Sequence, residues 1–177
     1  MSRTRAVVFF FFLLGAVVAA GSCTPDGRSP TEATPAGPST DLVGSLLSST
    51  GLLQCTPLPY ASTTQTVGPD GGVIRVGPHW LTIPAGALAA PVKITAELPV
   101  ANVNSVRFSP QGLTFSRPAT LWMSYQNCSL LGKLLPKRIA YTTDDFSIIS
   151  YLLSIDVVYW RHVYAPLDHF STYAVAW

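Results

Sequence analysis

The chain has 177 residues, about the length of one ordinary domain, with a formal net charge of +2. Charged residues make up 11% of the sequence and hydrophobic residues 48%, which excludes a disordered acidic or basic chain, a coiled coil and a nucleic-acid-binding protein with a basic stripe. The 15 Pro and 13 Gly punctuate what remains, so the composition indicates a globular, apolar chain with many turns.

The first 23 residues have the three parts of a secretory signal. Two arginines precede an uncharged apolar run over 6–20, and small residues come directly before Cys23. The run is shorter than the roughly 20 apolar residues that a stable membrane span needs, so we expect it to be cleaved rather than retained. Small residues followed by cysteine resemble the lipobox of bacterial lipoproteins, in which the cysteine is acylated and becomes the new N-terminus. We therefore expect a signal peptide over 1–22 and lipidation of Cys23.

The number of cysteines agrees with lipidation. The chain has three, and acylation of Cys23 leaves Cys55 and Cys128 as one possible pair. Because exported proteins meet an oxidising environment, we expect these two to form a structural disulfide. The mature protein would then be exported and anchored to the membrane, periplasmic or at the cell surface, without spanning it. The alternative is ordinary cleavage after Ala20, which would give a secreted protein.

Two segments separate this signal from the main body. Residues 23–41 hold the lipidated cysteine and a Pro/Ser/Thr-rich stretch with no aromatic and no large aliphatic residue, so we expect a disordered tether. Residues 42–66 form a lead-in, in which the apolar spacing from Leu42 to Leu53 after Asp41 predicts a short amphipathic helix.

From residue 67 to the end, short β-rich runs alternate with turn residues. Alternation of apolar and polar side chains predicts strands buried on one face only. The predicted strands cover residues 73–76, 80–83, 92–97, 105–108, 119–124, 138–141, 147–152, 163–165 and 171–176. The fold class is therefore all-β, an antiparallel β-sandwich of about 8–9 short strands. Trp80 and Trp122 lie in alternating strands, and we expect both in the core.

Three stretches resemble the ZU-five domain, the β-sandwich module of ankyrins, zonula occludens protein and netrin receptors. They are 71–88, which contains Ile-Pro-Ala-Gly-Ala-Leu; 108–121, with a Pro-x-Gly-x-x-Phe-x-x-Pro-x-x-Leu pattern; and the closing stretch 169–175. The resemblance implies a ZU-five-like domain over 67–177 with a protein-interaction and scaffolding function. Residues 130–137 and 147–161 have no obvious counterpart in the family.

One motif has a possible reaction. Some domains that resemble this one cleave their own backbone between Phe and Ser, which maps here to Ser171 as nucleophile, Phe170 as donor of the scissile carbonyl and His169 as base. The same triplet also serves as a structural feature of the closing strand, with His and Ser hydrogen-bonded and Phe in the core. We favour the structural role and expect neither self-cleavage nor any other catalytic activity.

Other chemistry has less support. Three scattered His and no clustered carboxylates predict no metal site and no cofactor. Asp144 and Asp145 are expected in a turn between strands rather than on a Ca²⁺ ion. Lys133, Lys137 and Arg138 form a small basic cluster, which either keeps a Leu-rich loop soluble or faces acidic lipid or polysaccharide.

Trp160 and Trp177 are the candidates for a partner surface, because the first lies outside the alternating strands and the second is the terminal residue. The expected function is a non-enzymatic protein-interaction or scaffolding module at the bacterial cell envelope. Its partner is an unknown envelope protein or glycan, nucleic acid is not expected as a ligand, and the membrane is contacted only through the lipid anchor. The alternatives are a self-processing domain cut at Phe170–Ser171 and a carbohydrate-binding or adhesive domain.

Overall fold

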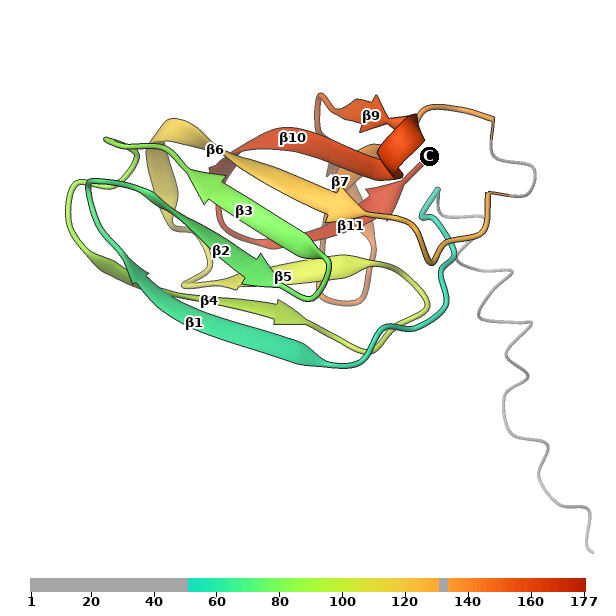
Figure 1. Cartoon of the computed structure of the whole chain (residues 1–177), viewed down its shortest axis with the longest axis horizontal. Helices are drawn as coiled ribbons and strands as arrows, with labels where there is room; N and C mark the ends of the chain where they lie inside the picture. The colour runs from blue at the N-terminus through green and yellow to red at the C-terminus, as the bar shows by residue number, and fades with distance from the viewer. Residues whose placement is uncertain (1–50, 131–133) are drawn as a thin grey trace, which may run out of the picture. The chain divides into compact units, whose positions relative to one another are not determined.

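Figure 1 shows the computed structural model, in which the described residues are 51–130 and 134–177. These residues contain eleven strands and one short 3-10 helix, with no α-helix among them. In chain order the elements are β1 (Ala61–Val67), β2 (Gly72–Val76), β3 (His79–Ile83), β4 (Val92–Leu98), β5 (Ser105–Ser109), β6 (Thr114–Ser124), β7 (Arg138–Thr142), β8 (Ile148–Tyr151), β9 (Ile155–Val157), η1 (Val158–Trp160), β10 (His162–His169) and β11 (Thr172–Ala176).

The strands form two sheets. One sheet has six strands in the order β1-β4-β5-β11-β7-β8, and the other has five in the order β2-β3-β6-β10-β9. Every pairing within them is antiparallel. The all-β, antiparallel class expected from the sequence is therefore confirmed. The two strands beyond the nine expected are β1 and β9, both at a sheet edge. The expected signal peptide, the expected tether and most of the expected lead-in helix lie outside the described residues.

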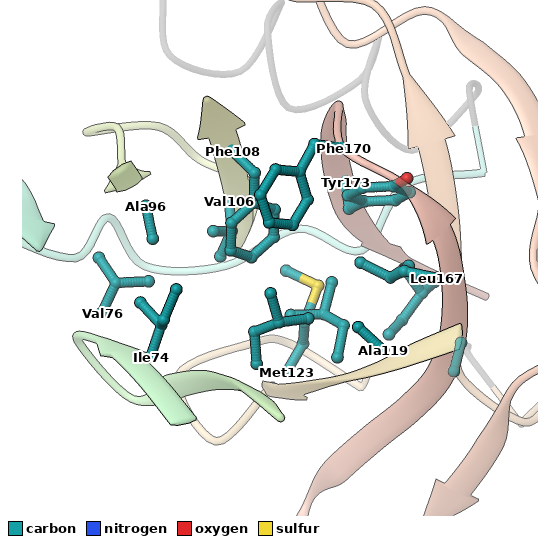
Figure 2. Packing of buried hydrophobic residues seen from close by; sticks show 14 of the residues in the cluster. Ile74, Val76, Ala96, Val106, Phe108, Ala119, Met123, Leu167, Phe170 and Tyr173 are labelled. Atoms are coloured by element: carbon teal, nitrogen blue, oxygen red, sulfur yellow. The ribbon is translucent and has the colours of Figure 1, made fainter. Parts of the chain in front are cut away.

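One hydrophobic cluster draws side chains from both sheets. In β3 and in β6 from Ala119 to Met123 every second side chain is buried, because successive residues of a strand point to opposite faces. Figure 2 shows the inward side chains of the two sheets facing one another. The six-stranded sheet contributes Val106, Phe108 and Tyr173, and the five-stranded sheet contributes Ile74, Ala119, Met123 and Leu167. This shared core holds the two sheets together.

The lead-in already belongs to this folded body at Gly51. Leu53 is fully buried in the shared core, and its amide donates to the Val175 carbonyl at 2.9 Å. Leu52 pairs with Ala176 and packs in a second, smaller cluster with Ala140 and Ala174 of β7 and β11. Small alanines on these two strands leave room for Leu52, so β11 is buried along its whole length.

The expected disulfide is confirmed. Cys55 and Cys128 are bonded to each other across 73 residues of sequence. Next to the bridge, the Asn104 amide donates to the Ser124 carbonyl at 2.8 Å and to the Asn127 side chain at 2.7 Å. The bridge therefore joins the lead-in to the segment after β6 at a point where the backbone is also tied by amide side chains.

The expectation that Trp80 and Trp122 lie in the core is wrong. Both are only partly buried and point outward from the five-stranded sheet, whereas their neighbours Leu81 and Leu121 are fully buried. Strand alternation separates two faces without saying which face is inside. The branched aliphatic residues of β3 and β6 occupy the inner face, so the tryptophans are left on the outer one.

Candidate functional site

The His169-Phe170-Ser171 triplet lies at the connection between β10 and β11. His169 ends β10 opposite Thr114, and β11 begins at Thr172 between β5 and β7. The backbone is held on both sides of the Phe170–Ser171 bond. The Phe170 carbonyl accepts from the Gly112 amide at 2.9 Å, and the Ser171 carbonyl accepts from the Phe108 amide at 3.0 Å.

The aromatic side chains of the triplet, Phe170 and His169, are used for packing. Phe170 is 1% exposed, with its ring stacked on Phe108 and edge-on to Phe115 at 5.0 Å in each case. The His169 ring lies edge-on to Tyr141 at 5.1 Å. Among the described residues, no hydrogen bond joins His169 to Ser171. Self-cleavage needs a base within hydrogen-bond reach of the Ser171 hydroxyl, and this structure does not place His169 there. The structural alternative expected Phe170 in the core, and Phe170 is buried there.

Asp144 and Asp145 lie in a turn between β7 and β8, as expected. The Asp144 carboxylate forms an ion pair with Arg107 at 3.0 Å and accepts from the Thr172 hydroxyl at 2.7 Å. Asp145 accepts from the hydroxyls of Thr143 and Ser147, and these hydrogen bonds lower the pKa of its carboxyl. Within the described ranges, no group of three His, Cys, Asp or Glu side chains is placed to hold a metal ion.

His79 is a buried histidine at the start of β3. Its Nδ1 accepts from the Ser124 amide at 3.0 Å, so the neutral ring carries its proton on Nε2. That buried Nε2 has no hydrogen-bond partner among the described residues. Burial, together with the nearby charge of His162, lowers the pKa of His79 from 6.5 to about 4. The side chain is therefore neutral at ordinary pH and serves to bind the β6 backbone.

A row of aromatic side chains crosses the outer face of the five-stranded sheet. We define the aromatic row as Trp80, Trp122 and Tyr164, which the strand register places directly opposite one another on β3, β6 and β10. The same register continues to Arg75 on β2 and to Ile155 on β9. The Arg75 guanidinium lies 5.7 Å from the Trp80 ring centroid, at the distance of a cation–π contact. One cross-strand line thus carries a cation, three aromatic rings and an aliphatic side chain.

The rings of the row stack on each other. Trp80 and Trp122 have centroids 5.4 Å apart with 11° between their planes, and Trp122 and Tyr164 are 4.3 Å apart with 23°. Both faces of the Trp122 ring are therefore covered by its neighbours. The row offers ring edges, and not a flat ring face, to anything that binds above it. Ring edges carry the positive part of the aromatic quadrupole and suit contact with other side chains.

A second surface surrounds Trp160. We define the apolar end surface as Leu134, Leu135, Leu153, Val158, Tyr159 and Trp160, all classed as exposed large hydrophobic residues. It combines residues 134–135 with residues 153–160, which are far apart in sequence. Asp156 links those stretches, because its carboxylate accepts from the Tyr125 hydroxyl at 2.6 Å and from the Lys137 amide at 2.8 Å. Burial and this contact raise the pKa of Tyr125, which stays a protonated donor.

Of the two predicted surface tryptophans, Trp160 is 60% exposed and belongs to the apolar end surface. Trp177 is half-buried and packs against the shared core, with its indole N–H donating to the Leu52 carbonyl at 3.2 Å.

The residues of the expected basic cluster differ in their exposure. Lys137 is buried and its amine donates to the Leu135 carbonyl, Arg138 is exposed, and Lys133 lies outside the described residues.

Sequence reasoning missed the aromatic row and most of the apolar end surface. The signal for the row was present, since Trp80 shares its strand face with Thr82, and Trp122 with Thr120, and threonine favours the solvent side. Leu134, Leu153 and Tyr159 carried no such signal, because an apolar residue in a short irregular segment is as compatible with a core as with a surface.

Cys23 and the expected signal lie outside the described residues. No helix that the structure describes is long and apolar enough to cross a membrane. Comparison with known proteins gives no matching family model and no matching curated protein for this chain.

Proposed function

We propose that this chain is a non-enzymatic protein-interaction or scaffolding module, a β-sandwich of ZU-five type, displayed at the bacterial cell envelope by a lipid anchor on Cys23. Two antiparallel sheets around one core support the sandwich. The Cys55–Cys128 bridge supports an oxidising, exported environment. In the candidate self-cleavage motif, the rings of Phe170 and His169 pack against other aromatic rings, which supports a binding role over catalysis.

The observation that carries this proposal is the aromatic row on an outward sheet face. Trp, Tyr and Arg are the residues most enriched at the energetic centres of protein interfaces, and here Arg75 adjoins two tryptophans and a tyrosine. Stacking has already fixed the rotamers of the rings, so a partner that binds them loses little side-chain entropy. Thr82 and Thr120 lie beside the row and provide a polar border.

The test is cross-linking of the intact chain in its native envelope, followed by identification of the adducts. We expect a discrete protein adduct that is lost when Arg75→Glu and Tyr164→Ser are combined. The matched control combines Lys93→Glu with Val100→Ser, which are exposed residues on or beside β4 of the other sheet. Identical adducts from both double variants would contradict the proposal, provided that both variants unfold at the same denaturant concentration as the parent chain.

Self-processing is the second candidate, and one contact favours it. The Gly112 amide already donates to the Phe170 carbonyl oxygen, where an attacked carbonyl needs a donor for its developing negative charge. A single donor without a base at hydrogen-bond distance from Ser171 supports structural use more than reaction.

Carbohydrate binding depends on Trp160 and Tyr159, the most exposed aromatic residues near η1. A glycan array separates this alternative from protein scaffolding. Capture of a glycan that is lost on Trp160→Ala would favour the carbohydrate-binding domain.

A further inference from the structure

We propose that the apolar end surface docks onto the lipid bilayer itself and forms a second membrane contact besides the anchor on Cys23. The occupant is the interface of a membrane that contains anionic lipid. The proposal rests on the proposed function only for the anchor, since the surface is argued from side chains that the structure describes.

The side chains of the apolar end surface are highly exposed. Leu134 is 99% exposed, Leu153 is 89% exposed and Tyr159 is 92% exposed, so these side chains stand clear of their neighbours. They project individually from the body, with shallow depressions between them. Apolar side chains that project from irregular segments, with Trp and Tyr beside them, suit the boundary between headgroups and acyl chains, where aromatic residues with one polar end are favoured.

The depressions between these exposed side chains are continuous with one another. Leu153 and Pro136 line one depression, and Pro136, Leu134 and Val158 line the next. Val158 also lines a third depression with Trp160. Because each depression shares a residue with the next, the exposed side chains form one surface at the end of the molecule where Figure 1 shows η1. Contiguous exposed apolar surface of this kind marks an interaction site.

Two arginines give the edge of the apolar end surface a positive charge. Arg138 and Arg161 flank the surface and are exposed, with Arg138 over the Tyr151 ring at 5.3 Å and Arg161 bonded to the Gln126 carbonyl at 3.1 Å. The one acid that lines these depressions in the described part of the chain is Asp156, and its oxygens already accept two hydrogen bonds. The rim is therefore positive and complements anionic headgroups.

The described part of the chain begins, at Gly51, close to the apolar end surface. Gly51 lies against Tyr151, whose hydroxyl would be 2.5 Å from a Cβ built on Gly51, and the Gly51 carbonyl accepts from the Trp177 amide at 3.0 Å. Tyr151 lines the same depression as Leu153. The described body therefore begins at Gly51 next to the apolar end surface, so a lipid anchor upstream of Gly51 keeps this surface within reach of the bilayer.

The test uses the full chain in vesicles of phosphatidylethanolamine and phosphatidylglycerol with brominated acyl chains, which quench tryptophan fluorescence on contact. We expect Trp160 to be quenched, so that Trp160→Phe removes most of the quenchable emission. Trp80→Phe is the matched control, because that indole lies in the aromatic row. The combined variant Leu134→Ser, Leu153→Ser and Tyr159→Ser should reduce the quenching of Trp160 at least about tenfold. This is the loss expected when three apolar side chains that docking would bury in the bilayer are replaced by polar ones. Tyr60→Ser with Val100→Ser, exposed apolar residues elsewhere, should leave it unchanged.

Failure of docking and failure of anchoring can be distinguished, because intact mass reports acylation separately. An acylated chain with unquenched Trp160 overturns docking alone. A chain without acyl groups whose Trp160 is still quenched supports docking and contradicts the anchor. Quenching that is unchanged by the three serine substitutions overturns docking, as does a soluble dimer that these substitutions dissociate, since a second copy would then cover the surface.

Discussion

His79 makes the stability of the folded body depend on pH. Its pKa falls from 6.5 in an unfolded chain to about 4 in the folded one, mainly because the buried ring cannot be solvated when charged. Between these values the unfolded chain binds one more proton than the folded chain, so the free energy of unfolding decreases as the pH falls from about 6.5 to about 4. The shift corresponds to about 3 kcal/mol, at 1.36 kcal/mol per pKa unit.

The matching variant is His79→Asn, whose side-chain oxygen can still accept from the Ser124 amide. Denaturant unfolding at pH 7.5 and pH 4 should show that the parent chain loses about 3 kcal/mol more than the variant over this range. An equal loss in both chains would show that His79 is not buried as described.

Ser171 should not cleave the chain. Phe170 is fixed between Phe108 and Phe115, and β11 lies in the middle of the six-stranded sheet, so the Phe170–Ser171 bond is clamped on both sides. We expect the chain to keep its last seven residues during prolonged incubation under native conditions, as Ser171→Ala should also do, so that each chain shows the mass of its own full sequence. Release of residues 171–177 from the parent chain but not from the variant would establish self-processing.

At the scale of elements, the disulfide stabilises the join between lead-in and sheets. Closing a loop with a sequence separation of 73 residues removes entropy from the unfolded chain worth about 4 kcal/mol at most. The double variant Cys55→Ala and Cys128→Ala should therefore unfold about 2–4 kcal/mol more easily than the parent chain. Calorimetry measures this difference in the free energy of unfolding. If the midpoint of thermal unfolding were the same in the parent chain and in the double variant, the bridge would be absent in the purified protein.

Leu52 tests whether the lead-in is a structural element of the body. It is fully buried against alanines of β7 and β11, so Leu52→Ala should cost about 2–5 kcal/mol of unfolding free energy. Leu153→Ala, which removes the same atoms from an exposed site, should change stability by less than about 0.5 kcal/mol. Similar effects of the two substitutions would contradict the described packing.

Most of the strands could be predicted from the sequence, because their alternating pattern follows from one buried and one exposed face. The hairpin of β2 and β3 and the strands β4, β5 and β7 are confirmed near the expected bounds. β1 was missed, since Ala-Ser-Thr-Thr-Gln-Thr-Val has small or polar side chains on both faces and pairs only at an edge. β9 was missed because three residues are too few to show a period.

The site was less predictable than the fold. Burial of Phe170 and exposure of Trp160 follow from local pattern, and the Cys55–Cys128 pair follows from counting cysteines. The aromatic row instead depends on the register between β3, β6 and β10. This register brings together Trp80, Trp122 and Tyr164, each of which is 42 positions from the next in sequence. The apolar end surface depends on how residues 134–137 meet η1, and nothing in either segment specifies the other.

At the scale of the whole molecule, the two surfaces lie on different parts of the described body. The aromatic row crosses the outer face of the five-stranded sheet, whereas the apolar end surface adjoins the point of chain entry at Gly51 (Figure 1). The two surfaces share no residue, so docking and partner binding use separate side chains. They come close at His162, whose ring lies 5.3 Å from Trp80 and which lines a depression with Val158 and Trp160.

We propose that the mature chain is an exported, acylated module with one disulfide and an intact Phe170–Ser171 bond. Intact-mass analysis of the chain extracted from a bacterial envelope, under denaturing but non-reducing conditions, tests this most directly. We expect a species that begins at Cys23 with acyl groups attached, ends at Trp177 and is two hydrogens lighter than the fully reduced form. A chain that begins after Ala20 without acyl groups, retains residues 1–22, or gains mass on alkylation of Cys55 and Cys128 without prior reduction would contradict it.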